Sequence, residues 1–255
     1  MSKHGGLLRV QDPAAASEWV EAEVQRWRSR AAEHHQPFTG ALLSDYHGFR
    51  HLPSGARFDR VLAFGGGDGE EILPVIDRAK QVTVVDASGL PLHPALAERG
   101  ARISGPTMNG LMAEEPDGAY DLITCLGVLT YLPDPIATFA ELRRCLAPGG
   151  WLLLREPIVA MNLEQPEQAG LGRHGRGIPL AIFDDLVRQG FAVCYRALCT
   201  VPLTRYFVPN SPNNPRAVRV DAALARLLAW NVTYRATRPW HHLRPKTAAY
   251  VLRKT

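Results

Sequence analysis

Residues 60–70 read RVLAFGGGDGE, a short apolar run followed by a glycine-rich turn. Glycine is needed where a backbone turns tightly or approaches a ligand without an intervening side chain. Glu70 and Glu71 then open a predicted helix, whose unpaired N–H groups would point into the turn. A strand, a glycine-rich turn and a helix N-terminus in this order predict a ligand-binding cradle.

The remaining apolar segments predict a sheet of seven strands around this turn. The expected strands are residues 60–64, 81–85, 101–103, 120–126, 151–154, 191–198 and 248–252. Helical segments alternate with them, and this alternation is typical of a Rossmann-like, doubly wound and mostly parallel α/β sheet. The last strand follows an insertion, so we expect it to lie antiparallel at the edge of the sheet.

Both ends of the chain carry additions to this sheet. Residues 1–57 are predicted to form an N-terminal helix, which begins at Asp12–Pro13, and a lid segment. Residues 58–255 are predicted to form the ligand-binding domain, and the insertion at 200–245 is expected to contribute to the substrate site. A total of 255 residues is enough for one large α/β domain with a sizeable core.

The composition excludes several classes of function. The net charge is only +4 and no lysine-rich run is present, which disfavours a nucleic-acid partner. No apolar stretch has the length of a membrane span. The four cysteines, Cys125, Cys145, Cys194 and Cys199, form no CxxC pair, so we interpret them as reduced packing residues of a cytoplasmic protein. The His, Asp and Glu residues show no compact metal-ligand spacing, and no metal is expected.

The spacing of the loop glycines separates two classes of cofactor. Dinucleotide-binding proteins use Gly-x-Gly-x-x-Gly, in which the third glycine lets helix and strand pack closely. Here that third place is Glu70, and the acidic pair Glu70–Glu71 would repel a pyrophosphate. Asp86 ends the second strand 21 residues after Gly65, where a carboxylate would accept hydrogen bonds from a ribose diol. The pattern is therefore poor for NAD.

Five stretches in order resemble the class I S-adenosylmethionine-dependent methyltransferases, over roughly residues 60–198 and the last strand. They are residues 61–69, 84–88, 116–123, 128–135 and 142–152. The resemblance implies a glycine loop around the methionine part of the cofactor, Asp86 on the ribose hydroxyls and Asn109 on the adenine amino group. The residues it implies for cofactor binding are Gly65, Gly66, Gly67, Asp68, Gly69, Asp86, Ala87, Asn109, Gly110 and Leu126.

One position departs from the family pattern. The family usually carries Asp or Glu two residues before the first loop glycine, and this chain has Ala63 there. That carboxylate commonly supports the methionine amine or the loop. We expect Asp68 or a residue of the N-terminal segment to substitute for it.

The acceptor chemistry is less determined by the sequence. Methyl transfer to a hydroxyl needs an aligned nucleophile and a base that takes the proton. Glu156, after the fifth strand, and His174, in the following loop, are the candidate catalytic residues. Residues 154–158 and 175–179 resemble methyltransferases found beside sugar-processing genes, which suggests an oxygen acceptor on a sugar, glycosylated or natural-product molecule.

Two other functions stay open at this point. Ala63 leaves room for a non-catalytic binding protein with a methyltransferase-like fold, and the glycine loop leaves room for an NAD-dependent oxidoreductase. The oligomeric state is open, a homodimer being one alternative, and neither a nucleic acid nor a membrane is expected as a partner.

Overall fold

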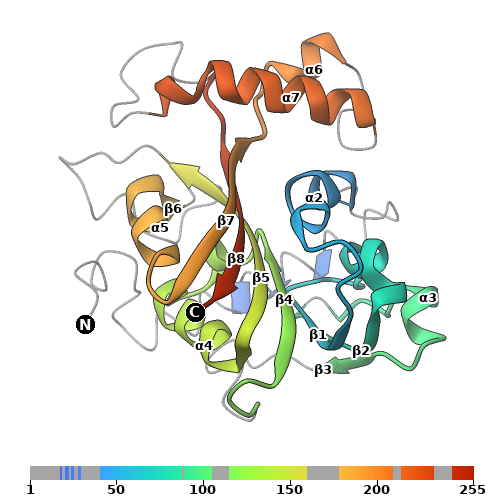
Figure 1. Ribbon diagram of the computed structural model, residues 1–255. Helices are drawn as coiled ribbons and strands as arrows, with labels where there is room; N and C mark the ends of the chain where they lie inside the picture. Colours follow the sequence, from blue (N-terminus) through green and yellow to red (C-terminus); the bar gives the residue numbers. More distant parts are fainter. Residues whose placement is uncertain are drawn as a thin grey trace.

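The computed structural model describes most of the chain (Figure 1). The described residues are 41–87, 89–104, 115–159, 178–208, 214–232 and 243–255, with Glu18, Glu21, Ala22, Val24, Gln25, Arg28 and Ser29. These last seven positions are helical, as the sequence predicts. The packing of that N-terminal helix, and its role as a lid, lie outside the described residues.

The predicted seven-stranded sheet is confirmed, in the order β3-β2-β1-β4-β5-β8-β7. β1 to β5 run parallel, β8 is antiparallel to both of its neighbours, and the two-residue β6 pairs with the end of β5. The strands are β1 (Phe58–Phe64), β2 (Ala79–Val85), β3 (Arg102–Ser104), β4 (Tyr120–Leu126), β5 (Leu146–Val159), β6 (Ile178–Pro179), β7 (Phe191–Cys199) and β8 (Thr247–Lys254).

The last strand is antiparallel as predicted, but its expected place at the edge is wrong. β8 lies between β5 and β7, and β7 forms the edge. The reason is the burial of the two strands. Residues 248–252 of β8 are buried on both faces, which suits a central strand, whereas β7 exposes several of its side chains, which suits an edge strand.

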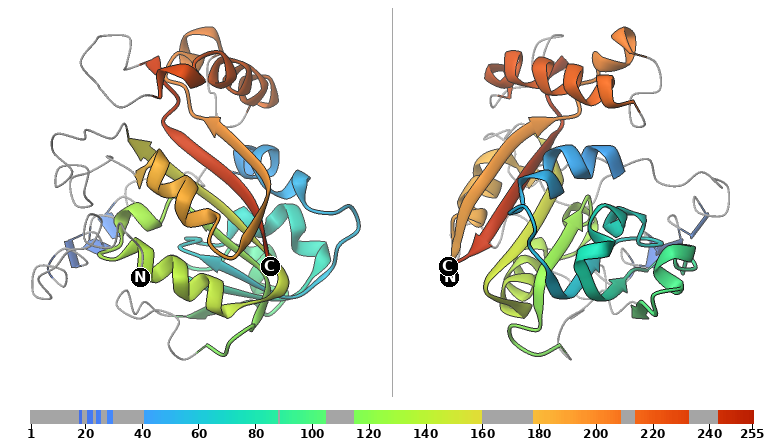
Figure 2. Two further views of the ribbon diagram at one scale, coloured as in Figure 1. Left: turned by 60° about the vertical axis from the view of Figure 1, so that its left-hand side comes forward. Right: turned by 45° about the vertical axis from the view of Figure 1, so that its right-hand side comes forward.

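Helices cover both faces of the sheet (Figure 2). One face carries η2 (Glu70–Arg78), α3 (Pro94–Ala97), α2 (Ala41–His47) and η1 (Phe49–His51); the other carries α4 (Pro135–Cys145) and α5 (Leu180–Val187). Phe49 and Leu52, which precede the expected boundary at residue 57, belong to the same buried cluster as Val61 of β1. The division of the chain at residues 57 and 58 stays a prediction.

Two helices differ from their predicted form. The segment after the glycine loop, η2, is a 3-10 helix with Pro74 inside it, because proline lacks the N–H that an α-helix would use there. The sequence predicts a helix over residues 178–189, capped by Gly190, but α5 begins only at Leu180, since Ile178 and Pro179 pair with β5.

The insertion after β7 is anchored above the sheet. It contains α6 (Thr204–Phe207), α7 (Pro215–Leu227) and η6 (Ala229–Asn231), and the helices lie beyond the end of β7 (Figure 1). The buried Asp221 of α7 accepts hydrogen bonds from Thr200 N and Val201 N, both at 2.7 Å. These bonds attach α7 to the turn at which the chain leaves the sheet.

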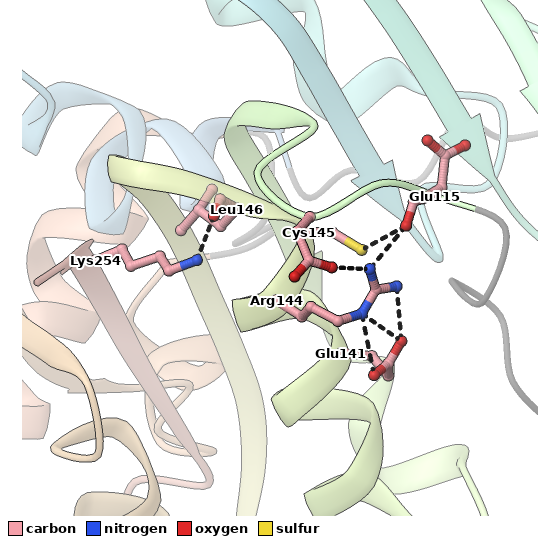
Figure 3. A network of polar contacts seen from close by, with 7 residues as sticks. Glu115, Glu141, Arg144, Cys145, Leu146 and Lys254 are labelled. Atoms are coloured by element: carbon pink, nitrogen blue, oxygen red, sulfur yellow. Dashed lines mark hydrogen bonds and ion pairs between the residues drawn. The ribbon is translucent and has the colours of Figure 1, made fainter.

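A polar network joins α4 to the segment that precedes β4 (Figure 3). Arg144 donates to Glu115 O at 2.8 Å, to Asp117 Oδ1 at 2.6 Å and to Glu141 Oε2 at 3.0 Å. The glycine loop follows the opposite end of the strands, so this network closes the far edge of the sheet and belongs to the scaffold.

The structure corrects one prediction about the cysteines. All four are free, and Cys125, Cys145 and Cys199 are buried, as expected of packing residues. Cys194 is exposed on β7, because β7 is the edge strand and its middle faces solvent.

Candidate functional site

The glycine loop forms a tight turn in a conformation that strongly favours glycine. Gly65, Gly67 and Gly69 have φ of 69°, 59° and 86°, in the left-handed region. A Cβ added at Gly65 would lie 2.3 Å from Val128 Cγ2, and one at Gly69 would lie 2.3 Å from Leu96 Cδ1. The loop therefore needs glycine both for its conformation and for its packing.

Asp86 is joined to this loop. It follows β2 directly, and its Oδ2 accepts a hydrogen bond from Gly67 N at 2.8 Å. Gly65 N donates to Val85 O at 2.7 Å, which ties the start of the loop to the same strand end. Parallel strands place their carboxyl ends along one edge of the sheet, and ligands of such sheets bind there.

The surroundings of the loop are strongly acidic. Asp68 lies in the loop and caps the first turn of η2, because its Oδ1 accepts from Glu70 N at 3.0 Å. Burial raises the pKa of Glu70 and of Glu71, and Asp68 raises both further. Asp86 adds to the effect on Glu71, whose pKa reaches about 7. Such a loop repels a pyrophosphate and favours a ligand with positive charge.

The end of β4 forms the next side of the site. Leu126 is partly buried, and Gly127, with a φ of 80°, donates from N to Arg155 O at 2.6 Å. Val128 follows and packs against Gly65. The structure thus brings the loop, Asp86, Ala87 and Leu126 to one edge of the sheet.

Glu156 is enclosed in the protein interior, whereas a catalytic base is expected to face the acceptor. Its side chain is fully buried, and its Oε1 accepts from Val128 N at 2.8 Å and Leu129 N at 3.0 Å. Its Oε2 accepts from Thr130 N at 3.4 Å. Burial nevertheless raises its pKa to about 7. A carboxylate so enclosed holds the turn before η3 (Leu129–Tyr131) and has no free path to an acceptor.

Three of the predicted residues, Asn109, Gly110 and His174, lie outside the described residues. Their roles stay predictions.

A second group of polar side chains lies between α2 and the sheet, and no sequence spacing links its members. His47 is buried, and its Nδ1 lies 2.8 Å from the Tyr195 hydroxyl of β7. Its Nε2 is buried without a partner among the described residues. Arg155, also buried, donates to Ser44 Oγ at 3.0 Å.

This group makes folding stability depend on pH. Burial, with Arg155 and other nearby cations, lowers the pKa of His47 from 6.5 to about 4. Between these values the unfolded chain binds a proton that the folded chain does not, so stability falls by up to about 3 kcal/mol as the pH drops from 6.5 to 4. Glu71 and Glu156, with raised pKa values, change stability in the opposite direction.

Two variants test the contribution of His47 to the pH dependence of stability. His47→Asn keeps a polar atom near the Tyr195 hydroxyl. Between pH 6.5 and 4, its free energy of unfolding in urea should fall by about 3 kcal/mol less than that of wild type. Tyr195→Phe leaves His47 in place and should keep the wild-type slope. An unchanged slope in His47→Asn would show that His47 already titrates normally in the folded chain.

The described residues contain no helix long and apolar enough to cross a membrane. In the same part of the chain, no group of three or more His, Cys, Asp or Glu side chains is arranged to hold a metal ion.

A family profile described as a methyltransferase domain matches residues 43–179, more than half of the chain. The ubiquinone biosynthesis O-methyltransferase of Pseudomonas aeruginosa is 32% identical over 99 residues, which cover 37% of this chain and 43% of that protein. The demethylmenaquinone methyltransferase of Thermus thermophilus is 34% identical over 102 residues, which cover 38% of this chain and 46% of that protein. The aligned region thus spans less than half the length of these curated relatives.

Solved structures share the fold at low identity. The 1,6-didemethyltoxoflavin-N1-methyltransferase of Burkholderia thailandensis has a TM-score of 0.58 and 17% identity, covering 97% of this chain and 94% of that one. A protein named as the 4+2 cyclase SpnF has a TM-score of 0.52 and 22% identity, covering 83% and 79%. Since a cyclase and a methyltransferase share this fold, the fold alone does not determine the reaction.

Proposed function

The chain belongs to the methyltransferase domain family with a class I, Rossmann-like fold, and on that premise we propose that it transfers a methyl group from S-adenosylmethionine to an oxygen atom of a small molecule. The observation that carries the proposal is the glycine loop hydrogen-bonded to Asp86 and surrounded by carboxylates. A pyrophosphate would meet Asp68, Glu70 and Glu71 there. A cofactor with a sulfonium and an ammonium group is attracted by the same charges.

The residues around the glycine loop suit the parts of this cofactor. Asp86 would accept hydrogen bonds from the ribose hydroxyls while it holds Gly67, and Ala87 would lie beside the adenine. Leu126 and Gly127 would line the methionine side. When bound, S-adenosylmethionine supplies a methyl group activated by its sulfonium, so the protein's task is to align the acceptor and remove a proton.

Fewer residues point to the acceptor than to the cofactor. The stretch that resembles sugar-associated enzymes includes Arg155 and Glu156. Their side chains are buried and bind Ser44 and the backbone N–H of Val128, respectively. Other elements must therefore recognise the acceptor. The insertion is the element we favour, because it lies beyond the strand ends and exposes Tyr206, Phe207 and Trp230. We therefore propose a hydroxylated natural product, glycosylated or aromatic, with an apolar part.

The proposed base is His174. With Glu156 enclosed by backbone N–H groups, we assign it a positioning role and keep His174 as the proposed base. An imidazole side chain has an ordinary pKa of about 6.5, so a histidine can accept a proton at physiological pH.

Two measurements test the proposed function. In calorimetric titrations we expect S-adenosylhomocysteine to bind and NAD not to bind. With S-adenosylmethionine and a panel of sugar, phenolic and glycosylated acceptors, we expect one product whose mass has increased by one methyl group in place of a hydrogen. Binding of NAD alone would favour the oxidoreductase. A folded protein that binds neither ligand would favour the non-catalytic binding protein.

A further inference from the structure

Ala63 provides no carboxylate beneath the glycine loop, and a carboxylate from η2 lies close to this position instead. Ala63 is fully buried in β1, and a Cβ built at Gly66 would come within 2.7 Å of the Ala63 Cβ. The side chain of residue 63 therefore lies directly beneath the glycine loop. Ala63 is also paired in register with Thr124 of β4.

A carboxylate reaches this place from η2. The Thr124 hydroxyl donates a hydrogen bond to the Glu71 carboxylate. Since Thr124 is the register neighbour of Ala63, Glu71 Oε1 is held beside the position that a carboxylate on residue 63 would occupy. Thr124 is fully buried, whereas Glu71 as a residue is only partly buried. Glu71 is thus anchored on one side and reachable from another.

Charged groups face Glu71 from several elements. Asp68 of the loop and Asp86 after β2 are anions, and Arg155 of β5 is a cation. From α2, Ser44 accepts a hydrogen bond from Arg155. Burial, Asp86 and Asp68 raise the pKa of Glu71 to about 7, while Thr124 and Arg155 act against the rise. A cationic ligand group placed among these carboxylates would relieve their repulsion.

We propose that Glu71, held by Thr124, binds the ammonium group of the cofactor's methionine part and so replaces the carboxylate that Ala63 cannot provide. This inference rests on the proposed function, because it assumes an S-adenosylmethionine-type ligand in the loop. In this proposal Glu71 takes the role that the sequence alone led us to expect of Asp68 or of a residue in the N-terminal segment.

Two ligands that differ in the amino-acid part test it. S-adenosylhomocysteine carries the ammonium group, whereas 5′-methylthioadenosine keeps the adenosine and thioether but lacks it. In Glu71→Gln we expect S-adenosylhomocysteine to bind about ten- to a hundredfold more weakly, the value of a charged hydrogen bond, and 5′-methylthioadenosine to bind as in wild type. Glu98→Gln, an exposed carboxylate at the end of α3, is the matched control and should change neither affinity.

The pH dependence gives a second readout. An ammonium bound to Glu71 favours its ionised form, so binding at a pH below about 7 must displace a proton. The affinity of wild type for S-adenosylhomocysteine should therefore fall as the pH decreases from 7.5 to 5.5, and this dependence should be smaller in Glu71→Gln.

The outcomes separate this inference from the proposed function. Equal weakening of both ligands in Glu71→Gln, or no weakening of either, would overturn the role of Glu71 while leaving the cofactor assignment intact. Failure of wild type to bind either ligand would instead overturn the proposed function.

Discussion

Asp86→Ala should weaken the binding of S-adenosylhomocysteine by about a hundredfold, or about 3 kcal/mol. Asp86 is proposed to accept hydrogen bonds from two ribose hydroxyls, and charged hydrogen bonds contribute about 1.5–3 kcal/mol each. The variant also removes the acceptor of Gly67 N, which is 2.8 Å from Oδ2, so the loop loses part of its support. Isothermal titration calorimetry measures the effect directly.

The control for this variant is a carboxylate away from the loop. Asp77 lies at the end of η2, is exposed and pairs with Arg99, so Asp77→Ala should leave ligand affinity unchanged. Thermal melting without ligand establishes that both variants are folded. Wild-type affinity in Asp86→Ala would mean that the ribose is held elsewhere.

Glu156→Ala should destabilise the fold by about 4 kcal/mol or more. The substitution leaves Val128 N and Leu129 N without their buried acceptor, and each unsatisfied group costs about 1–3 kcal/mol. It also opens a cavity next to the fully buried Cys125. The free energy of unfolding in urea measures the loss, and failure to accumulate folded protein would agree with it.

Glu156→Gln separates positioning from catalysis. Its amide oxygen can still accept from Val128 N and Leu129 N, so we expect a loss of only about 1–2 kcal/mol and nearly wild-type methyl transfer. Val128 packs against Gly65, so the turn that Glu156 holds also supports the glycine loop. A stable Glu156→Gln variant with transfer reduced a thousandfold would restore Glu156 as the base.

Local sequence signals predicted much of the scaffold because the responsible interactions are local. β4 runs from Tyr120 to Leu126 as the apolar run indicates. α4 begins at Pro135, where the Asp134 side chain accepts from Ala137 N at 2.9 Å. The sequence predicts that the helix of the insertion begins only at Asp221, after a proline-rich stretch. In the structure α7 begins at Pro215, where the Asn214 side chain accepts from Arg216 N in the same way.

The cofactor side of the site was predictable for the same reason. The glycine loop and Asp86 each follow a strand, and parallel strands bring their carboxyl ends together whatever lies between them. The sequence alone therefore determined the doubly wound sheet, the loop and the carboxylate that faces it.

Only the tertiary structure decided the rest, because it depends on contacts between residues far apart in the chain. Pairing across the sheet placed β8 between β5 and β7. Folding enclosed Glu156 in the N–H groups of a turn 26–28 residues earlier. It also brought Glu71 to Thr124, 53 residues away and next to Ala63. The sequence alone shows only that Ala63 lacks the usual carboxylate. No local sequence pattern predicts the contact between Glu71 and Thr124, since it depends on the packing of η2 on the sheet.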